Sequence, residues 1–434
     1  MYLQKKFFII LFFLILFNIF FENICMAVEP TIYSQSAILI DSNSGDVLFE
    51  KNSNALMYPA STTKVLTAII ALESCPLDEK ITASPNAINS IQSGYTNAKI
   101  QVGETLTMED LLYALLLKSA NEAANVIAEH IGGSIENFAN IMNAKAIELG
   151  CTGTHFVNAN GIHNDAHYTT ASDLAKITKY CMQNETFRHM VSTEQYTLPA
   201  TEQYPSTDRI LKNTNSLMIK GHKYYYPYAI GGKTGFTTQA KNCLIAISDK
   251  NGLELISVVL HAESTEDGRS ARYLDTINLL EYGNNNYKSC SILEKNQIVD
   301  NVEVSNNSKT SKLNVIAKNR LAVTMPISKE LNISSSDIHI EQNLSAPIQK
   351  GTVLGYASYV VGDKTYKTDL IAESDINLIS SSDALESSTI DFKLFIYILL
   401  ILILIRVLIL FFKKIIVTYR SHKLKKRTKK YLNP

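Results

Sequence analysis

Hydrophobic and polar positions follow two different periods near the start of the chain. Alternating runs at residues 36–40 and 46–50 flank the turn sequence Asn43-Ser44-Gly45, which predicts a β-hairpin. Just after Pro59, apolar residues recur at helical spacing from Thr62 to Leu72. This spacing predicts a buried helix.

The middle of the chain carries mainly the helical period. Thr107 to Asp110 resembles a capping box for a helix through Leu117, and a second helix is expected from about Asn121 to His130. Residues 138–183 predict a helix, a polar loop and another helix.

Strands return after this helical part. Residues 242–248 and 253–261 are strongly apolar and are joined through Asn251-Gly252, a turn typical of hairpins. A last helix is expected over residues 269–282. Strands, then helices, then strands predict an α+β fold in residues 28–285, with an antiparallel sheet flanked by helices.

The pattern changes past Ser289. Short alternating runs, such as residues 313–317 and 353–361, contain no cluster of chemically reactive residues and predict a small all-β domain over residues 289–378. Residues 379–392 are rich in serine and acidic residues, and we expect them to form a solvated linker.

Residues 1–27 have the features of an export signal. Lys5 and Lys6 precede an apolar stretch from Phe7 to Phe21, and a small-residue cleavage pattern ends at Ala27. We therefore expect a signal peptide that is removed after Ala27. The alternative, an uncleaved N-terminal anchor, is disfavoured because the apolar run is short for a membrane span.

A second apolar stretch lies near the other end. At about 1.5 Å per residue, a helix over residues 393–412 would cross most of a bilayer core, and it is interrupted only by Arg406. The tail, residues 413–434, has nine Lys and Arg and no acidic residue. The positive-inside rule places this tail in the cytoplasm and residues 28 to about 392 outside the cell membrane.

Composition narrows the class of partner. The 434 residues include 41 Lys and Arg and 41 Asp and Glu, and 46% are hydrophobic, which excludes wholesale disorder. Between the two apolar ends, residues 28–393 hold 29 basic and 40 acidic residues. Because this body is acidic, a nucleic acid is not an expected partner.

Candidate metal ligands are sparse. The six cysteines are widely spaced, so no disulfide framework or zinc pattern follows from them. His163 and His167 lie four residues apart, but on a predicted loop this spacing does not place them on one face. We therefore expect no metal and no other cofactor.

Tyr224-Tyr225-Tyr226 is interpreted as part of a half-buried strand rather than as a platform for sugars.

Ser61 and Lys64 offer a nucleophile and a base. They stand three residues apart at the start of the first predicted helix, so their side chains share one face. A serine hydroxyl needs such a base, because its own pKa is far too high for it to ionise at neutral pH. By itself the pair is more often an ordinary polar helix start than a catalytic pair.

Two further short motifs contain polar residues suited to a cleft. Ser119-Ala120-Asn121 lies in the break between two apolar helices, where its alternative role is helix capping. Lys233-Thr234-Gly235 begins the late strand region, where the Lys and Thr could bind a carboxylate and the Gly lets a substrate backbone approach. Taken alone, this motif is also compatible with a simple turn.

The three motifs together, in this order, resemble the signature of penicillin-binding proteins and class A β-lactamases, except that Ala120 stands where the middle motif has an Asp. The chain resembles the serine-type D-Ala-D-Ala carboxypeptidases, the low-molecular-mass penicillin-binding proteins, over about residues 30–285, and their C-terminal domain up to about residue 375. The stretches that carry the resemblance are Tyr58–Lys64, Ser119–Ala124, His155–Gly161, Thr170–Ala175, Gly232–Thr237 and Ile348–Gly355.

The resemblance implies a fold like that of β-lactamases and a peptidase that removes the terminal D-Ala from peptidoglycan stem peptides and binds β-lactams covalently. It implies that Ser61 attacks, that Lys64 accepts its proton and that Ser119 protonates the leaving amine. Asn121 and the Lys233-Thr234-Gly235 motif would bind the substrate, whose terminal carboxylate Lys233 and Thr234 would hold. The main-chain N–H groups of Ser61 and Phe236 would form the oxyanion hole.

The sequence supports one further expectation about the base and leaves two details open. A lysine base requires a lowered pKa, which we expect the positive charge of Lys233 to provide for Lys64. Lys241 stands where many relatives have a glycine, which leaves the local turn in question but affects no catalytic group. No residue is nominated by its spacing as the base of deacylation.

Two other functions are compatible with these motifs. A serine β-lactamase shares the attack on a carbonyl but hydrolyses its acyl-enzyme quickly, and the extra β domain and membrane span count against it. A wall-binding module without catalysis would keep the fold. It is disfavoured because all the residues of the three motifs are present.

Overall fold

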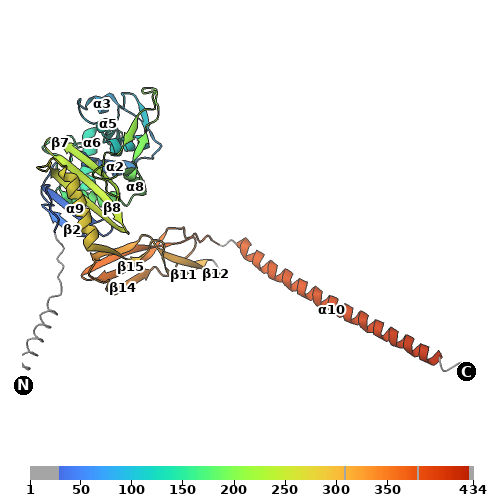
Figure 1. Ribbon diagram of the computed structural model, residues 1–434. Coiled ribbons are helices and arrows are strands. Elements are labelled where there is room, and N and C mark those ends of the chain that lie inside the picture. Colours follow the sequence, from blue (N-terminus) through green and yellow to red (C-terminus); the bar gives the residue numbers. More distant parts are fainter. Residues whose placement is uncertain (1–28, 307–308, 379–380, 430–434) are drawn as a thin grey trace, which may run out of the picture. The chain divides into compact units, whose positions relative to one another are not determined.

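The computed structural model describes residues 29–306, 309–378 and 381–429 (Figure 1). The expected signal peptide, residues 1–27, lies outside them. The chain divides into two compact units. The first comprises residues up to Leu293 with Leu321–Ser334 and Val360–Tyr366, and the second comprises the remaining residues.

A five-stranded antiparallel sheet forms the centre of the first unit. Its strand order is β2-β1-β9-β8-β7. The strands are β1 (Ser36–Asp41), β2 (Val47–Lys51), β7 (Ala229–Thr237), β8 (Lys241–Lys250) and β9 (Leu253–Ala262). The two predicted hairpins, β1–β2 and β8–β9, both form. Strand β7 therefore lies at the edge of this sheet.

Both faces of the sheet are buried, each against a different helical layer. In β1, Ile38 and Ile40 face the larger core, whereas Ala37 and Leu39 face the smaller one, as the two-residue period of a strand requires. Helix α9 (Ala271–Asn286) packs on β8 and β9 in the smaller core (Figure 1).

The helices of the larger core lie on the other face of the sheet (Figure 1). They are α2 (Lys64–Ser74), α4 (Met108–Tyr113), α5 (Asn121–Gly132), α6 (Ile135–Glu148), α7 (Ala171–Cys181) and α8 (Glu185–Ser192). This is the antiparallel sheet flanked by helices that the order of elements predicts. Short elements complete the unit: η1 (Ala60–Thr63), α3 (Pro85–Asn89), and the strand pairs β3 (Lys80–Thr82) with β4 (Thr105–Thr107) and β5 (Gln195–Thr197) with β6 (Ile210–Lys212).

The predicted helix from Thr107 ends differently from the expectation. Its capping box forms, with Thr107 and Asp110 bonding to each other's main chain. After Tyr113, however, the helix widens into the π-helical segment η2 (Ala114–Lys118). Ser119 then takes a left-handed conformation with φ of 63°, and α5 begins two residues later.

The tyrosine triplet was wrongly predicted to be in a strand. Tyr224, Tyr225 and Tyr226 lie in the turns before β7, where the N–H of Tyr226 bonds to Leu217. Tyr224 and Tyr226 are buried in the smaller core, and Tyr224 stacks on Tyr273 with ring centroids 4.9 Å apart. The strand was predicted because aromatic residues are frequent in strands, but the backbone of residues 221–228 forms turns and irregular structure instead.

Strands follow α9. Strand β10 (Tyr287–Leu293) pairs with β13 (Leu321–Pro326). A five-stranded sheet has the order β11-β12-β16-β15-β14. Its strands are β11 (Ile298–Asn306), β12 (Lys309–Ala317), β14 (Ile333–Ile340), β15 (Val353–Val361) and β16 (Lys364–Ala372). Both runs that the alternating pattern singled out, residues 313–317 and 353–361, are in strands.

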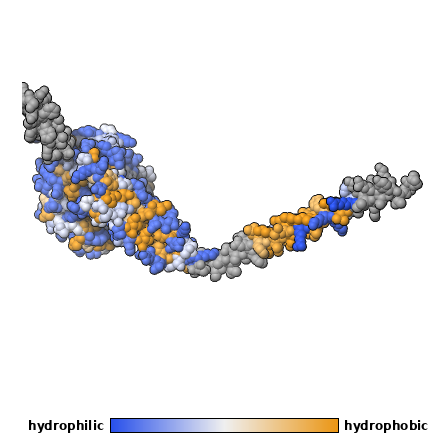
Figure 2. Space-filling model, turned by 90° about the horizontal axis from the view of Figure 1, so that it is seen from below, coloured by the Kyte–Doolittle hydropathy of each residue, from blue (hydrophilic) through white to orange (hydrophobic). Residues whose placement is uncertain are grey.

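The last described element is a long helix, α10 (Ser381–Lys429). It includes most of the segment expected to be a linker, since the helix begins before the apolar stretch. Leu394–Arg420 is apolar and long enough to cross a membrane, and it is not buried against the protein. Figure 2 shows the hydrophobic band along this helix and hydrophilic residues after it.

Candidate active site

Ser61 lies in η1, one turn before helix α2. The residue before it, Ala60, has a φ of 48°, a conformation that a residue with a Cβ adopts at a cost. The hydroxyl of Thr62 bonds to Pro59 and that of Thr63 to Ala60, which holds this turn. Ser61 itself is partly exposed, whereas its neighbours are buried. The turn therefore presents the Ser61 hydroxyl at the surface of a rigid segment.

Lys64 is completely buried beside this hydroxyl. Its Nζ lies 2.9 Å from Ser61 Oγ and 2.9 Å from Asn121 Oδ1, and it also bonds to the main-chain oxygen of Asn160. A neutral amine has two N–H groups and one lone pair. The oxygens of Asn121 and Asn160 can accept both N–H groups, which leaves the lone pair for the proton of Ser61.

The electrostatic environment favours this neutral form. Burial is the largest cause that holds the pKa of Lys64 well below its usual range, and the charge of Lys233 acts in the same direction. The carboxylate of Glu122 opposes both. The expected effect of Lys233 is therefore present, but it comes second to burial, which the sequence could not reveal.

Ser119 and Asn121 stand at the junction of η2 and α5. Asn121 contacts Lys64 through its side-chain oxygen, and its Nδ2 donates to the carbonyl of Thr96 at 2.9 Å. Ser119 is 8% exposed, and within the described residues its hydroxyl makes no hydrogen bond. The left-handed turn thus leaves this hydroxyl available for a proton transfer.

Glu122 follows Asn121 and was not singled out by its sequence pattern. It is buried and accepts the N–H of Ala98 at 2.6 Å, while its Oε2 has no hydrogen-bond partner in the part of the chain that the structure describes. Burial raises the pKa of this carboxyl group. Together with the bonds from Asn121 to Thr96, this contact fixes residues 96–100 against the start of α5.

The Lys233-Thr234-Gly235 motif lies in edge strand β7, which packs against η1. A Cβ at Gly235 would lie 3.0 Å from Pro59 O and 3.1 Å from the main-chain nitrogen of Ser61. A side chain here would press on the main chain of the η1 turn, so glycine suits this close approach of strand and nucleophile. Phe236 follows with its ring 62% exposed. The N–H groups of Ser61 and Phe236 therefore belong to two segments in direct contact.

Lys233 and Thr234 are buried in this strand. Lys233 Nζ donates to the carbonyl of Thr234 at 2.9 Å, and the hydroxyls of Thr234 and Thr214 are 2.8 Å apart. Burial, followed by the charge of Arg272, lowers the pKa of Lys233 to about 7. Arg272 also donates weakly to Gly235 O. Neither Thr214 nor Arg272 was found from the sequence, because folding alone brings them to β7.

The loop at residues 155–169 closes the other side of the site. It supplies the Asn160 carbonyl to Lys64, and the Asn160 side chain bonds to Asn125 at 3.0 Å. Gly161 has a φ of 79°, and a Cβ there would clash with the main chain of Ala60. The stretch His155–Gly161 contributes to the sequence resemblance, which assigns it no role. In the structure it binds the amine of Lys64 and packs against the turn at Ala60.

His167 is part of the same loop and does not form a metal site with His163. Its Nδ1 accepts the N–H of Val157, and its Nε2 lies 2.9 Å from the hydroxyl of Thr63. Burial lowers the pKa of His167 to about 3, so the ring is neutral. Both ring nitrogens are occupied, and the ring supports the η1 turn through Thr63.

Lys241 begins β8, directly after the turn that follows β7. The turn forms, but Lys241 has a φ of 55°. This left-handed conformation is easy for glycine and costly for lysine. This backbone conformation is a physical reason to expect a glycine at this position, as the sequence resemblance does.

Family comparisons agree with this arrangement. The model of the family described as D-alanyl-D-alanine carboxypeptidase matches residues 24–264, and that of the penicillin-binding protein 5 C-terminal domain matches residues 287–381. A D-alanyl-D-alanine carboxypeptidase of Bacillus subtilis, DacF, is 32% identical over 328 residues, which are 74% of this chain and 80% of the relative.

Solved structures share the fold. Penicillin-binding protein 5 of Haemophilus influenzae aligns with a TM-score of 0.59 and 24% identity, over 81% of this chain and 99% of that one. The Streptomyces K15 DD-transpeptidase aligns with a TM-score of 0.54 and 32% identity, over 59% of this chain and 99% of that one. The predicted fold class is thereby confirmed, and the chain belongs to the D-alanyl-D-alanine carboxypeptidase family of serine peptidases.

Proposed function

We propose that this peptidase removes the terminal D-Ala of peptidoglycan stem peptides through an acyl-enzyme on Ser61, with Lys64 as its base. The observation that carries the proposal is the placement of Lys64. Its buried amine lies 2.9 Å from Ser61 Oγ, and its other two positions are occupied by acceptor oxygens. Such an amine can take the proton of Ser61 when it attacks.

In the acylation step, Ser61 Oγ bonds to the carbonyl carbon between the two terminal D-Ala residues and its proton moves to Lys64 Nζ. The negative oxygen that forms is stabilised by the main-chain N–H groups of Ser61 and Phe236. The C–N bond then breaks. Ser119 gives a proton to the leaving amine and recovers one from Lys64, so free D-Ala departs and Lys64 is neutral again.

The terminal carboxylate of the substrate binds at β7. Lys233 supplies a positive charge and Thr234 a hydroxyl, whose partner Thr214 holds its orientation. Asn121 Nδ2 and the main chain at Gly235 contact the peptide. A site that requires this carboxylate selects the last residue of a peptide, which explains cleavage at the end of a stem rather than within it.

In deacylation, water attacks the ester carbonyl and returns the proton to Ser61 Oγ. Neutral Lys64 is the base nearest to that oxygen, and we assign the activation of water to it. β-Lactams, whose covalent binding is typical of this family, acylate Ser61 in the same way. They deacylate slowly, because the amine released by ring opening is joined to the acyl group and stays in the site.

We also propose that residues 1–27 export the chain and that α10 holds it to the cell membrane as a single span, with residues 413–434 in the cytoplasm. The peptidase domain, residues 28–285, then faces the cell wall. The small β domain, residues 289–378, serves as a spacer on the way to the span. The exposed apolar band Leu394–Arg420 supports the anchor.

A second candidate reaction is transfer of the acyl group to an amine of another stem peptide. Its support is the 32% identity to the Streptomyces K15 DD-transpeptidase. The first half of the reaction would be the same, and only the acceptor would differ. A serine β-lactamase would instead release an opened penicillin rapidly.

The test is incubation of the purified protein with a peptide that ends in D-Ala-D-Ala, with free D-Ala as the readout. Ser61→Ala and Lys64→Ala should release none, while Ser119→Ala should be slowed. Thr152→Ala, a change at an exposed hydroxyl outside the proposed chemistry, is the control for general damage. Release by Ser61→Ala would contradict the proposal. Dimeric product in the presence of an acceptor amine would favour transpeptidation.

A further inference from the structure

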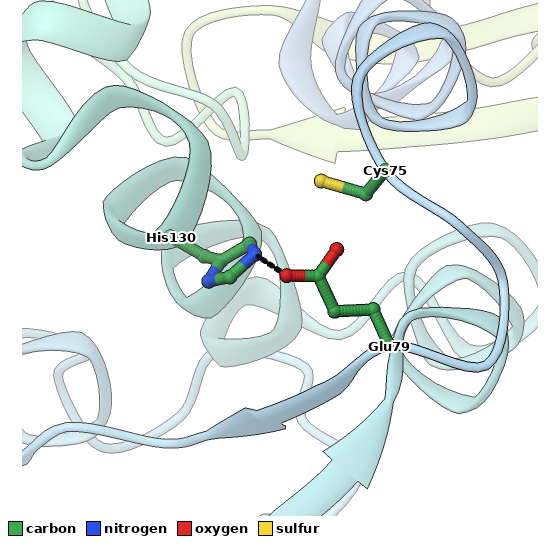
Figure 3. A group of neighbouring side chains, drawn as sticks. All are labelled: Cys75, Glu79 and His130. Carbon is green, nitrogen blue, oxygen red and sulfur yellow. Dashed lines mark hydrogen bonds and ion pairs between the residues drawn. The ribbon is translucent and has the colours of Figure 1, made fainter.

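Three side chains with metal-binding atoms meet on the surface of the first unit. They are Cys75, Glu79 and His130, and their Sγ, carboxylate oxygen and ring nitrogen all lie within 4.8 Å of one another (Figure 3). His130 Nε2 lies 2.9 Å from Glu79 Oε1. Figure 3 shows the three side chains pointing toward a common space, from three different segments of the chain.

Each of these side chains is carried by a fixed piece of backbone. Cys75 is the C-cap of α2, and its N–H bonds to Ala71. Glu79 directly precedes β3, and its carbonyl accepts the N–H of Met108 at 2.9 Å. His130 is in the last turn of α5. The cluster therefore does not depend on a free loop.

We propose that Cys75, Glu79 and His130 bind a zinc ion. Thiolate, imidazole and carboxylate are the ligands that Zn²⁺ takes in proteins, at about 2.0–2.3 Å, and a thiolate disfavours Mg²⁺ and Ca²⁺. With the three atoms already within 4.8 Å of one another, small side-chain rotations would bring them to one ion. His130 is exposed, so water completes the fourth position. The thiol gives its proton to solvent on binding.

The position of the cluster indicates a structural role for this ion. Helices α2 and α5 begin at the active site, where Lys64 bonds to Asn121, and they end at Cys75 and next to His130. The 11 residues of α2 separate the two places by about 16 Å, too far for a role of the ion in the chemistry at Ser61. The ion would join the far ends of the two helices that carry the base and Asn121.

The test uses the reduced full-length protein in detergent micelles, with Co²⁺ as a spectroscopic substitute for Zn²⁺. One equivalent of Co²⁺ should give the near-ultraviolet absorption of a cobalt–thiolate bond, and one equivalent of Zn²⁺ should remove it. Cys75→Ser should abolish the band, and His130→Gln and Glu79→Gln should weaken Co²⁺ binding at least tenfold. Acylation by labelled penicillin shows that each variant is folded.

Matched controls are Cys290→Ser, the other partly exposed free thiol among the described residues, and His189→Gln, another exposed histidine in the last turn of a helix. Both should bind Co²⁺ like the parent protein. A band that survives in Cys75→Ser, the lack of any thiolate band in the folded parent, or failure of Zn²⁺ to displace Co²⁺ would each overturn the proposal.

Discussion

At the scale of single residues, the amine of Lys64 is held out of solvent between three oxygens that come from η1, α5 and the loop at residues 155–169. A second buried lysine, Lys233, adds a like charge. The productive state has Lys64 neutral and Lys233 charged. We therefore expect a bell-shaped pH profile whose two limits belong to the pair rather than to either lysine.

Lys233→Ala tests this coupling. It should lower kcat/KM by about 30-fold or more, because a charge-assisted bond to the substrate is lost. It should also move the acidic limb of the acylation rate to higher pH, since removal of the like charge raises the pKa of Lys64. Acylation by labelled penicillin from pH 5 to 10 measures the limb. Lys212→Ala, at an exposed lysine of β6, is the control, and a change in KM alone would refute the coupling.

Lys241→Gly should stabilise the protein. Lysine is held at a φ of 55°, and its exposed ion pair with Glu263, 3.6 Å long, contributes little. Glycine relieves the backbone but is more flexible when unfolded, so the expected net gain is about 0.5–1 kcal/mol. Thermal unfolding measures it. Lys241→Ala keeps the Cβ and should give no gain; equal gains in both variants would show that the backbone is not the cause.

The contact between the nucleophile and its base could be predicted from the sequence, whereas the other groups around the base could not. The spacing of Ser61 and Lys64 implied contact, because three residues are one helical turn. The partners of Lys64 from further away, Asn160 and Glu122, depend on where a loop and a second helix finally pack. Neither has a local pattern that distinguishes it from other buried polar residues.

At the scale of elements, the short segment η1 depends on the loop behind it. His167 accepts the N–H of Val157 and lies 2.9 Å from the hydroxyl of Thr63, which in turn bonds to the carbonyl of the strained Ala60. The neutral ring thus joins two elements and supports the turn that presents Ser61.

His167→Gln should reveal this support through its pH dependence. At pH 7 the variant should be less stable by about 2 kcal/mol, since buried groups lose their partners. The folded pKa of His167 is about 3, below the ordinary 6.5, so the unfolded chain binds a proton that the folded protein does not. The free energy of unfolding of the parent therefore falls between pH 6.5 and 3, by about 1.4 kcal/mol per pH unit.

The variant lacks this loss, so the two stabilities should converge near pH 5. Urea unfolding at pH 7 and pH 5 measures the difference, with the exposed His189→Gln as control. A gap between parent and His167→Gln that stays constant over this range would show that the ring is not held neutral.

The elements themselves followed from the sequence where one period was strong. The hairpins β1–β2 and β8–β9 combine apolar runs with turn residues, and both formed. The end of α4 was missed, because the apolar spacing of residues 114–118 does not distinguish an α-helix from a π-helix. The strand expected at the tyrosine triplet was wrong because side-chain size gives no information on the turns at residues 217–226.

At the scale of the whole molecule, the proposed membrane anchor rests on the apolar part of α10. Residues Leu394–Arg420 of α10 are apolar and exposed on all sides, and a membrane is the environment that would cover them. The body between the two apolar ends is acidic, so a nucleic acid is not an expected partner.

A chain that stops after Leu378, at the end of the small β domain, should therefore be recovered in the soluble fraction outside the cytoplasmic membrane. The full chain should stay with membranes after washing at high pH and be released only by detergent. A chain that stops after Phe412 loses only the basic tail and is the matched control, since it keeps the span. Soluble recovery of the full chain, or membrane retention of the shorter one, would contradict the anchor.

The enclosure of Lys64 also limits how a population under antibiotic selection can change this enzyme. The three oxygens around the amine come from separate segments of the chain. If a substitution removes one of these oxygens, the residue next to it in the chain does not replace the lost hydrogen bond. Variation that spares wall trimming while weakening drug capture is therefore confined to exposed side chains at the rim, such as that of Phe236. Escape from penicillins would have to come through these outer positions or through faster turnover of the bound drug.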